Sequence, residues 1–128
     1  MIINTLYKTD TLIDGIKYNP PSKINNYGYA IVLTWKNENG QLHNENGPAV
    51  IGYNENGNVS YKSWYINGKY HNENGPAVIR YYENGNVECK NWCVNGKYHN
   101  ENGPAFIAYD ENGNITKQQY WENGIKIK

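Results

Sequence analysis

Residues 92–114 have the sequence Trp-Cys-Val-Asn-Gly-Lys-Tyr-His-Asn-Glu-Asn-Gly-Pro-Ala-Phe-Ile-Ala-Tyr-Asp-Glu-Asn-Gly-Asn, and residues 64–86 are nearly identical to them. Ten of the 13 glycines follow an asparagine, and the steps between these ten run 7, 10 and 11 residues three times over. A spacing that recurs without insertion or deletion is the signature of a repeat protein. The sequence therefore consists of 28-residue repeats.

The repeats divide the chain into an N-terminal cap and an array. Residues 1–27 break the period and are predicted to cap the first edge, whereas residues 28–128 form the array. Terminal units of such arrays commonly depart from the repeat pattern because they have a neighbour on one side only. The copies lie near residues 36–63, 64–91, 92–119 and, truncated, 120–128.

The Asn-Gly pairs predict tight turns between strands. A type I′ turn needs positive φ at both central residues, which asparagine tolerates and glycine adopts without steric cost. We assign such turns to the Glu-Asn-Gly-Asn segments at 55–58, 83–86 and 111–114. Residues 67–75 and their copies are assigned to one wide connecting loop. About two strands per repeat, without helical periodicity, predict an all-β, single-layer antiparallel meander of repeated hairpins.

Composition limits the class of partner. The net charge is zero, with no basic run, which disfavours binding to the backbone of nucleic acid. No stretch is long and apolar enough to predict a membrane span, and none resembles a signal peptide. A cytoplasmic location is therefore expected, in the host cell if the protein is viral. Cys89 and Cys93 lie about 13 Å apart along one predicted strand, at roughly 3.3 Å per residue, and are predicted to be free thiols.

One histidine recurs in each copy, at His43, His71 and His99. Equivalent residues two strands apart are separated by about 9–10 Å, too far to share a zinc ion whose ligands lie about 2 Å from it. Each histidine is instead predicted to hold a backbone group of its own wide loop. The nearby Glu45, Glu73 and Glu101 are predicted to be solubilising turn residues, and no metal or cofactor is expected.

The repeat resembles a variant of the MORN repeat family. The resemblance rests on Trp-x-x-Asn-Gly-Lys-x-His at 64–71 and 92–99, followed by Gly-Pro-Ala, an alternating strand and Asn-Gly. It covers about residues 28–128, and repeats of this form are familiar from uncharacterised viral and bacterial proteins. The resemblance implies an elongated, curved single-layer sheet with a binding or scaffolding role, and it supplies no catalytic residues.

Side chains along a strand alternate between the two faces of a sheet. Pairing across Asn84-Gly85 sets Tyr82 opposite Val87, Ile79 opposite Lys90 and Ala77 opposite Trp92. The face that carries Ala77 barely changes between copies, and we predict that it is a packing ladder that fixes the register; an aromatic platform for a ligand is the alternative. The ladder consists of Ala49, Ile51, Tyr53, Trp64, Ala77, Ile79, Tyr81, Trp92, Ala105, Ile107, Tyr109 and Tyr120.

The opposite face varies between copies, so the repeat geometry does not require its residues. It is either plain solvated surface or the surface that binds a partner, and tyrosine, tryptophan and arginine are the residue types enriched at binding hot spots. We predict that the contact residues are Tyr61, Tyr65, Arg80, Tyr82 and Trp121. Apolar strips on both faces of a thin sheet also predict a homodimer.

Three functions fit these features. The first is a non-enzymatic binding module that docks a partner protein through the variable face, as a viral or phage protein acting on a host factor would. The second is a protein that sequesters a small ligand, a nucleotide or a glycan, between aromatic rings. The third is a structural or assembly subunit. We favour the first, because catalysis needs a unique constellation of residues and this sequence repeats its motifs in every copy.

Overall fold

The structure is a computed structural model that describes residues 11–13, 16–18, 21–28 and 30–128. The described residues form strands and no helix, so none of them forms a helix that could cross a membrane. The predicted cap, residues 1–27, lies partly outside the described residues.

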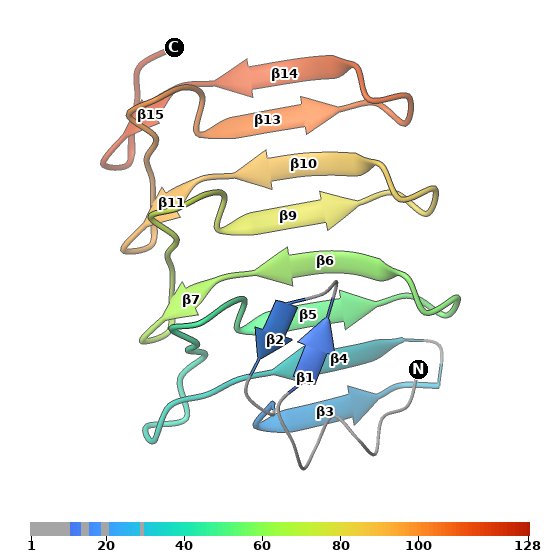
Figure 1. Ribbon diagram of the computed structural model, residues 1–128. Helices are drawn as coiled ribbons and strands as arrows, with labels where there is room; N and C mark the ends of the chain where they lie inside the picture. The colour runs from blue at the N-terminus through green and yellow to red at the C-terminus, as the bar shows by residue number, and fades with distance from the viewer. Residues whose placement is uncertain (1–10, 14–15, 19–20, 29) are drawn as a thin grey trace.

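Eight strands form one antiparallel sheet, in the order β14-β13-β10-β9-β6-β5-β4-β3 (Figure 1). Every strand pairs with its neighbour along this series, which makes the sheet a meander and confirms the predicted fold class. The first strand, β3, comes from the predicted cap and forms one edge. The strands are β3 (Lys23–Asn26), β4 (Ile31–Thr34), β5 (Val50–Tyr53), β6 (Val59–Ser63), β9 (Val78–Tyr81), β10 (Val87–Asn91), β13 (Phe106–Tyr109) and β14 (Ile115–Gln119).

Short hairpins occupy segments for which the sequence predicted one wide loop. Three of them stand one above another at the same end of the long strands, and we call them the hairpin column (Figure 1). They are β7 (Tyr65–Ile66) with β8 (Lys69–Tyr70), β11 (Cys93–Val94) with β12 (Lys97–Tyr98), and β15 (Trp121–Glu122) with β16 (Ile125–Lys126). A further short pair, β1 (Thr11–Ile13) with β2 (Ile16–Tyr18), lies near the N-terminus.

The wide-loop prediction was wrong because the type I′ turns lie at a different set of Asn-Gly pairs. Asn67 and Gly68 have φ of 48° and 81°, and Asn95 and Gly96 have φ of 52° and 80°. Positive φ at both central residues lets two residues connect the strands. A two-residue strand on each side of the Asn67-Gly68 turn, β7 and β8, then completes the hairpin.

The Glu-Asn-Gly-Asn segments form wider loops than predicted. In the loop at 54–58, the Gly57 N–H donates to the Asn54 carbonyl, and the Asn54 N–H donates to Asn58 across the loop. Only the glycine has positive φ there, as in a three-residue loop that ends in a glycine bulge. The strand register shifts by one residue next to such a loop. In the equivalent hairpin of β9 and β10, Tyr81 rather than Tyr82 therefore lies opposite Val87.

The predicted register is correct further from the turn. Ile79 lies opposite Lys90, and the next pair is Val78 with Asn91. At the end of these strands the Ala77 N–H donates to the Asn91 carbonyl at 2.7 Å. The bulge therefore changes the pairing only next to the loop, where the extra residue is absorbed.

Each histidine joins its repeat to the next one. Nδ1 of His43 accepts a hydrogen bond from the Asn67 N–H at 2.9 Å. His71 and His99 accept equivalent bonds from Asn95 and Asn123, each at 3.0 Å. The histidine does hold a backbone group, as predicted, but the group belongs to the next hairpin and not to its own loop. Since Nδ1 accepts, the imidazole proton resides on Nε2, the atom that faces the glutamate two residues later.

The apolar core is concentrated toward the N-terminal end of the sheet. Leu33 and Ile51 are fully buried, and Trp35 and Tyr53 pack with them. The small residues of the predicted ladder are also completely buried in every copy, at Ala49, Ala77 and Ala105. The ladder rings further along the array, such as Trp64 and Trp92, are half-buried.

The two turn types predict different tolerance to alanine. Asn95→Ala should lower the free energy of unfolding by about 1 kcal/mol, because alanine disfavours positive φ. Asn56→Ala is the matched control: Asn56 is also exposed and lies next to a glycine in the other loop type, but its φ is not positive. Denaturant unfolding of both variants measures the difference, and equal losses would contradict the assignment of the turns.

A carboxylate in the last Glu-Asn-Gly-Asn loop, at residues 110–114, predicts that stability depends on pH. The backbone N–H of Asn114, the side-chain amide of the same residue and the Asn112 N–H lower the pKa of Asp110 below its ordinary 3.8. A lowered folded-state pKa contributes stability that is present above the unfolded value and is lost as pH falls through the folded value. Asp110→Asn keeps the accepting oxygen and removes the titration.

Acid unfolding of the two proteins tests this expectation. Between about pH 5 and about pH 2, Asp110→Asn should lose less stability than the wild type. Glu55→Gln, in the Glu-Asn-Gly-Asn loop at residues 54–58, controls for the loss of one carboxylate. Parallel curves for the wild type and Asp110→Asn would show that the bonds to Asp110 do not favour its charged form.

Candidate binding surface

A cluster of three tyrosines and one arginine lies where the long strands meet the hairpin column. The Tyr65 ring stacks on the Tyr70 ring, with centroids 4.5 Å apart and planes inclined by 29°. The Arg80 guanidinium lies 5.7 Å from the Tyr61 ring centroid. Tyr61 pairs with Arg80 on the neighbouring strand, and Arg80 lines one cleft with Tyr70, so the four side chains form one group.

Local packing holds the Tyr61 ring in place. Tyr61 pairs with Gly52 on one neighbouring strand and with Arg80 on the other. A Cβ at position 52 would collide with the Tyr61 ring, so only glycine lets this ring lie against the backbone of β5. The same repeat position holds Arg80 and Ala108 in the later copies. This combination of glycine, tyrosine and arginine therefore belongs to one copy only.

The hydroxyls of Tyr61 and Tyr65 remain neutral at physiological pH. Burial, together with a hydrogen bond between the Tyr65 and Tyr70 hydroxyls, raises the pKa of Tyr65. Burial also raises the pKa of Tyr61, against the opposing effect of the Arg80 charge. Both hydroxyls keep their protons and can donate as well as accept hydrogen bonds.

A cleft of about 330 Å³ opens beside the cluster. Its lining residues are Tyr70, Val78, Arg80, Asn91, Cys93, Gly96 and Tyr98. The Asn91 amide donates to the Tyr98 hydroxyl at 3.0 Å, whereas its Oδ1 is buried and accepts no hydrogen bond within the described part of the chain. The cleft thus combines aromatic walls, one positive charge and an amide.

The cysteines give this cleft no reactive thiolate. Cys89 and Cys93 are both free, and Cys93 is 5% exposed. Burial raises the pKa of the Cys93 thiol to about 11, and burial also raises the pKa of Cys89. Because the thiolate is the nucleophilic form, both sulfurs are inert at neutral pH.

The structure brings three of the five predicted contact residues together. Tyr61, Tyr65 and Arg80 belong to the cluster. Trp121 lies further along the hairpin column, and its ring packs on the Tyr98 ring with centroids 5.2 Å apart. Tyr82 lies apart from them, in the loop at the other end of β9, where its hydroxyl donates to the Tyr109 carbonyl at 2.7 Å.

Tyr70 and Tyr98 were missed at the sequence level because their segments were assigned to wide loops. The signal that finds them is a two-residue turn at Asn67-Gly68 and at Asn95-Gly96. Such turns set Tyr70 opposite Tyr65 and Tyr98 opposite Cys93, as observed. We define the aromatic surface as Tyr61, Tyr65, Tyr70, Arg80, Tyr98 and Trp121.

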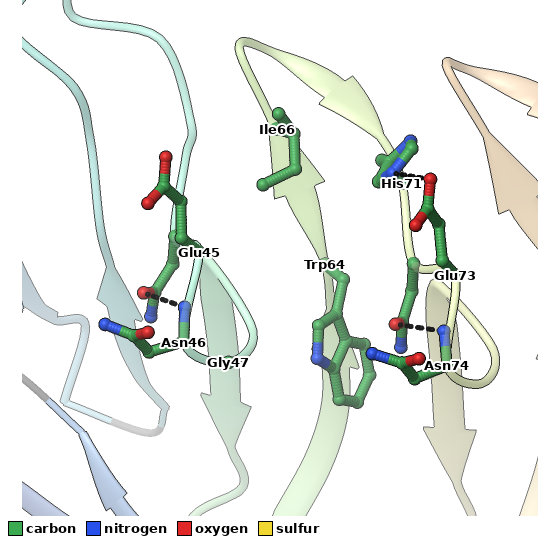
Figure 2. Close-up of a pocket in the computed structure, with 10 residues that line it drawn as sticks. Glu45, Asn46, Gly47, Trp64, Ile66, His71, Glu73 and Asn74 are labelled. Atoms are coloured by element: carbon green, nitrogen blue, oxygen red, sulfur yellow. Dashed lines mark hydrogen bonds and ion pairs between the residues drawn. The ribbon is translucent and has the colours of Figure 1, made fainter.

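Two similar clefts lie between the Asn-Glu-Asn-Gly loops of successive repeats. In the first, of about 530 Å³, Trp64 and Ile66 lie between the loop of Glu45 and the loop of Glu73 (Figure 2). In the second, of about 330 Å³, Trp92 and Val94 take the corresponding positions. We call them the loop clefts. Alternation along the strand places Trp64 and Ile66 on the face opposite to Tyr65.

An asparagine shapes each of these loops. The Asn44 side chain accepts from the Asn46 N–H at 3.1 Å and donates to the Pro48 carbonyl at 3.0 Å. Asn72 and Asn100 make the same pair of bonds in the later copies. Over the described residues, no three His, Cys, Asp or Glu side chains gather in an arrangement that could hold a metal ion.

Comparison of the chain with protein-family models, curated proteins and solved structures gave no match. The resemblance to MORN repeats therefore stays a prediction.

The packing of Tyr61 predicts that Gly52→Ala is destabilising. The added Cβ forces the ring out of its position, and overpacking of this kind costs about 1–3 kcal/mol. A Cβ at Gly75 would meet only the Asn72 amide at 3.7 Å, so Gly75→Ala is the control. Unfolding free energies measure both effects. In the double variant Gly52→Ala/Tyr61→Ala, the cost of Gly52→Ala should largely disappear, and additive losses would contradict the collision.

Proposed function

We propose that this chain is a non-enzymatic binding module that docks a partner protein on the aromatic surface. The observation that carries the proposal is the convergence of Tyr61, Tyr65, Tyr70 and Arg80 beside a cleft. These four residues come from four different strands, so the fold rather than one local motif assembles them.

The residue types suit a protein partner. Tyrosine and arginine are the types most enriched at hot spots, because they provide apolar area together with directional hydrogen bonds. Tyr70 is 38% exposed, and Arg80 is exposed, so both reach solvent. The cleft next to them offers a place for one anchoring side chain of the partner, and the Arg80 charge favours an acidic or carbonyl-rich rim.

A binding role also agrees with the chemistry that the surface lacks. Tyr61 and Tyr65 are neutral, and the Cys93 thiol that lines the cleft is protonated. The side chains can therefore recognise a partner by contact and hydrogen bonding, and the surface offers no activated nucleophile or base.

A capture experiment tests the proposal. The wild type and the double variant Tyr65→Ala/Arg80→Ala are used as baits in a lysate of the source organism or, for a viral protein, of its host. A partner of the aromatic surface should be captured by the wild type and lost by the double variant, with affinity reduced at least about tenfold. Calorimetry with the purified partner measures that reduction.

Two controls define the outcome. Lys117→Ala removes one positive charge from β14, outside the aromatic surface, and should bind as the wild type does. Light scattering on the purified chain shows whether the partner is a second copy, which the double variant would then leave monomeric. A partner that binds the double variant with unchanged affinity would contradict the proposal.

A further inference from the structure

The loop clefts are acidic. The first is lined by Glu45 and Glu73 and the second by Glu73 and Glu101, and neither lining includes a lysine or an arginine. The glutamate side chains are 73–78% exposed, so their charges are available to a ligand. His71 and His99 each accept a backbone N–H at Nδ1. Two negative charges thus flank each cleft.

An indole ring lies between these charges. Figure 2 shows Trp64 between the loop that carries Glu45 and the loop that carries Glu73, with Ile66 beyond it. The face of an indole attracts a cation, and the aliphatic stem of a lysine or arginine packs on apolar side chains. Trp92 and Val94 provide the same floor in the second cleft. Each loop cleft therefore fits one basic side chain.

The spacing of the clefts selects the conformation of the ligand. Successive clefts are one repeat apart, which is two strands or about 9.6 Å in a sheet. A polyproline II helix has three residues per turn and rises about 9.3 Å per turn. It presents every third side chain on one side at the pitch of the clefts. A β-strand repeats on one side about every 6.7 Å and does not match.

We propose that the two loop clefts bind a basic, proline-rich segment in the polyproline II conformation, with cationic side chains three residues apart. One arginine or lysine enters each cleft, stacks on the indole and faces the two flanking carboxylates. Glu73 lies between the clefts and faces both cations. This site is on the sheet face opposite to the aromatic surface and does not depend on the function proposed above.

Synthetic peptides test the proposal on the full chain. The probe is a labelled peptide with the sequence Arg-Pro-Pro-Arg-Pro-Pro-Arg, and the control has three adjacent arginines followed by four prolines. Fluorescence anisotropy should show that the spaced peptide binds about tenfold more tightly than the clustered one, because only the spaced peptide can place a cation in both clefts. Its affinity should fall steeply with added salt.

A matched pair of variants locates the binding site. Glu73→Gln removes a charge from both clefts and should weaken binding of the spaced peptide about threefold to tenfold. Glu55→Gln removes one exposed carboxylate outside the loop clefts and should leave binding unchanged. Thermal unfolding of both variants verifies that the fold is intact.

Four outcomes would overturn the inference. They are failure of the spaced peptide to bind at millimolar concentration, equal affinity for the spaced and clustered peptides, and equal effects of Glu73→Gln and Glu55→Gln. The fourth is binding of tetramethylammonium as tightly as the spaced peptide, which would mean that each cleft acts alone.

Discussion

The arrangement of the repeats depends on the backbone N–H groups of the type I′ Asn-Gly turns. In a two-residue hairpin loop these groups have few partners within their own hairpin. Here the asparagine N–H donates to a histidine of the preceding repeat, and the glycine N–H donates to a carbonyl of that repeat, as at Asn67 and Gly68. A neutral hydrogen bond of this kind contributes about 0.5–1.5 kcal/mol net. Together with the bond that the Asn44 N–H donates to the Tyr65 carbonyl, and its copies, these two bonds join each hairpin to the repeat before it.

These bonds give the hairpin column the same spacing per repeat as the long strands. A long-strand sheet adds two strands per repeat at a fixed spacing, and a column linked by directional bonds must adopt the same pitch. Residues of the two parts are thereby held in a constant relation, as in the cleft that Tyr70 from the column and Arg80 from the sheet both line. The same relation places Trp64 and Trp92 between successive loops on the other face.

The long strands were predictable because alternation, proline positions and the regular spacing all indicate the same pairing. The pairing of Ile79 with Lys90 was derived from a two-residue turn at Asn84-Gly85, and it is correct because the bulge changes the register only next to the loop. The turn types were not predictable from the Asn-Gly pair, since the same two residues form both. In two of the Glu-Asn-Gly-Asn loops, the side chain three residues before the glycine, Asn54 or Asp110, accepts N–H groups across the loop. Tyr82 replaces that acceptor in the middle copy and bonds to the Tyr109 carbonyl instead.

The candidate site was only partly predictable, because its assembly also depends on the turn types. Variation between copies identified Tyr61, Tyr65 and Arg80 as surface residues, and these do come together. Their convergence with Tyr70 depends on the two-residue turn at Asn67-Gly68, which sets Tyr70 opposite Tyr65 and which was assigned to a wide loop. Tyr82 was placed with them because alternation along the strand puts it on the face of Arg80, but it lies in the loop after β9 and its hydroxyl donates to the Tyr109 carbonyl.

The two candidate surfaces differ in how often they occur along the array. The loop clefts are built from residues that recur, such as Trp64 with Trp92 and Glu45 with Glu73, so the clefts recur as well. The aromatic surface depends on Gly52, Tyr61 and Arg80, whose counterparts in other copies are different residues, so it occurs once in the described chain. A recurring site suits a ligand with a matching repeat, whereas a single site suits one particular partner. The same scaffold can therefore hold a periodic segment on one face and a unique surface on the other, without interference between them.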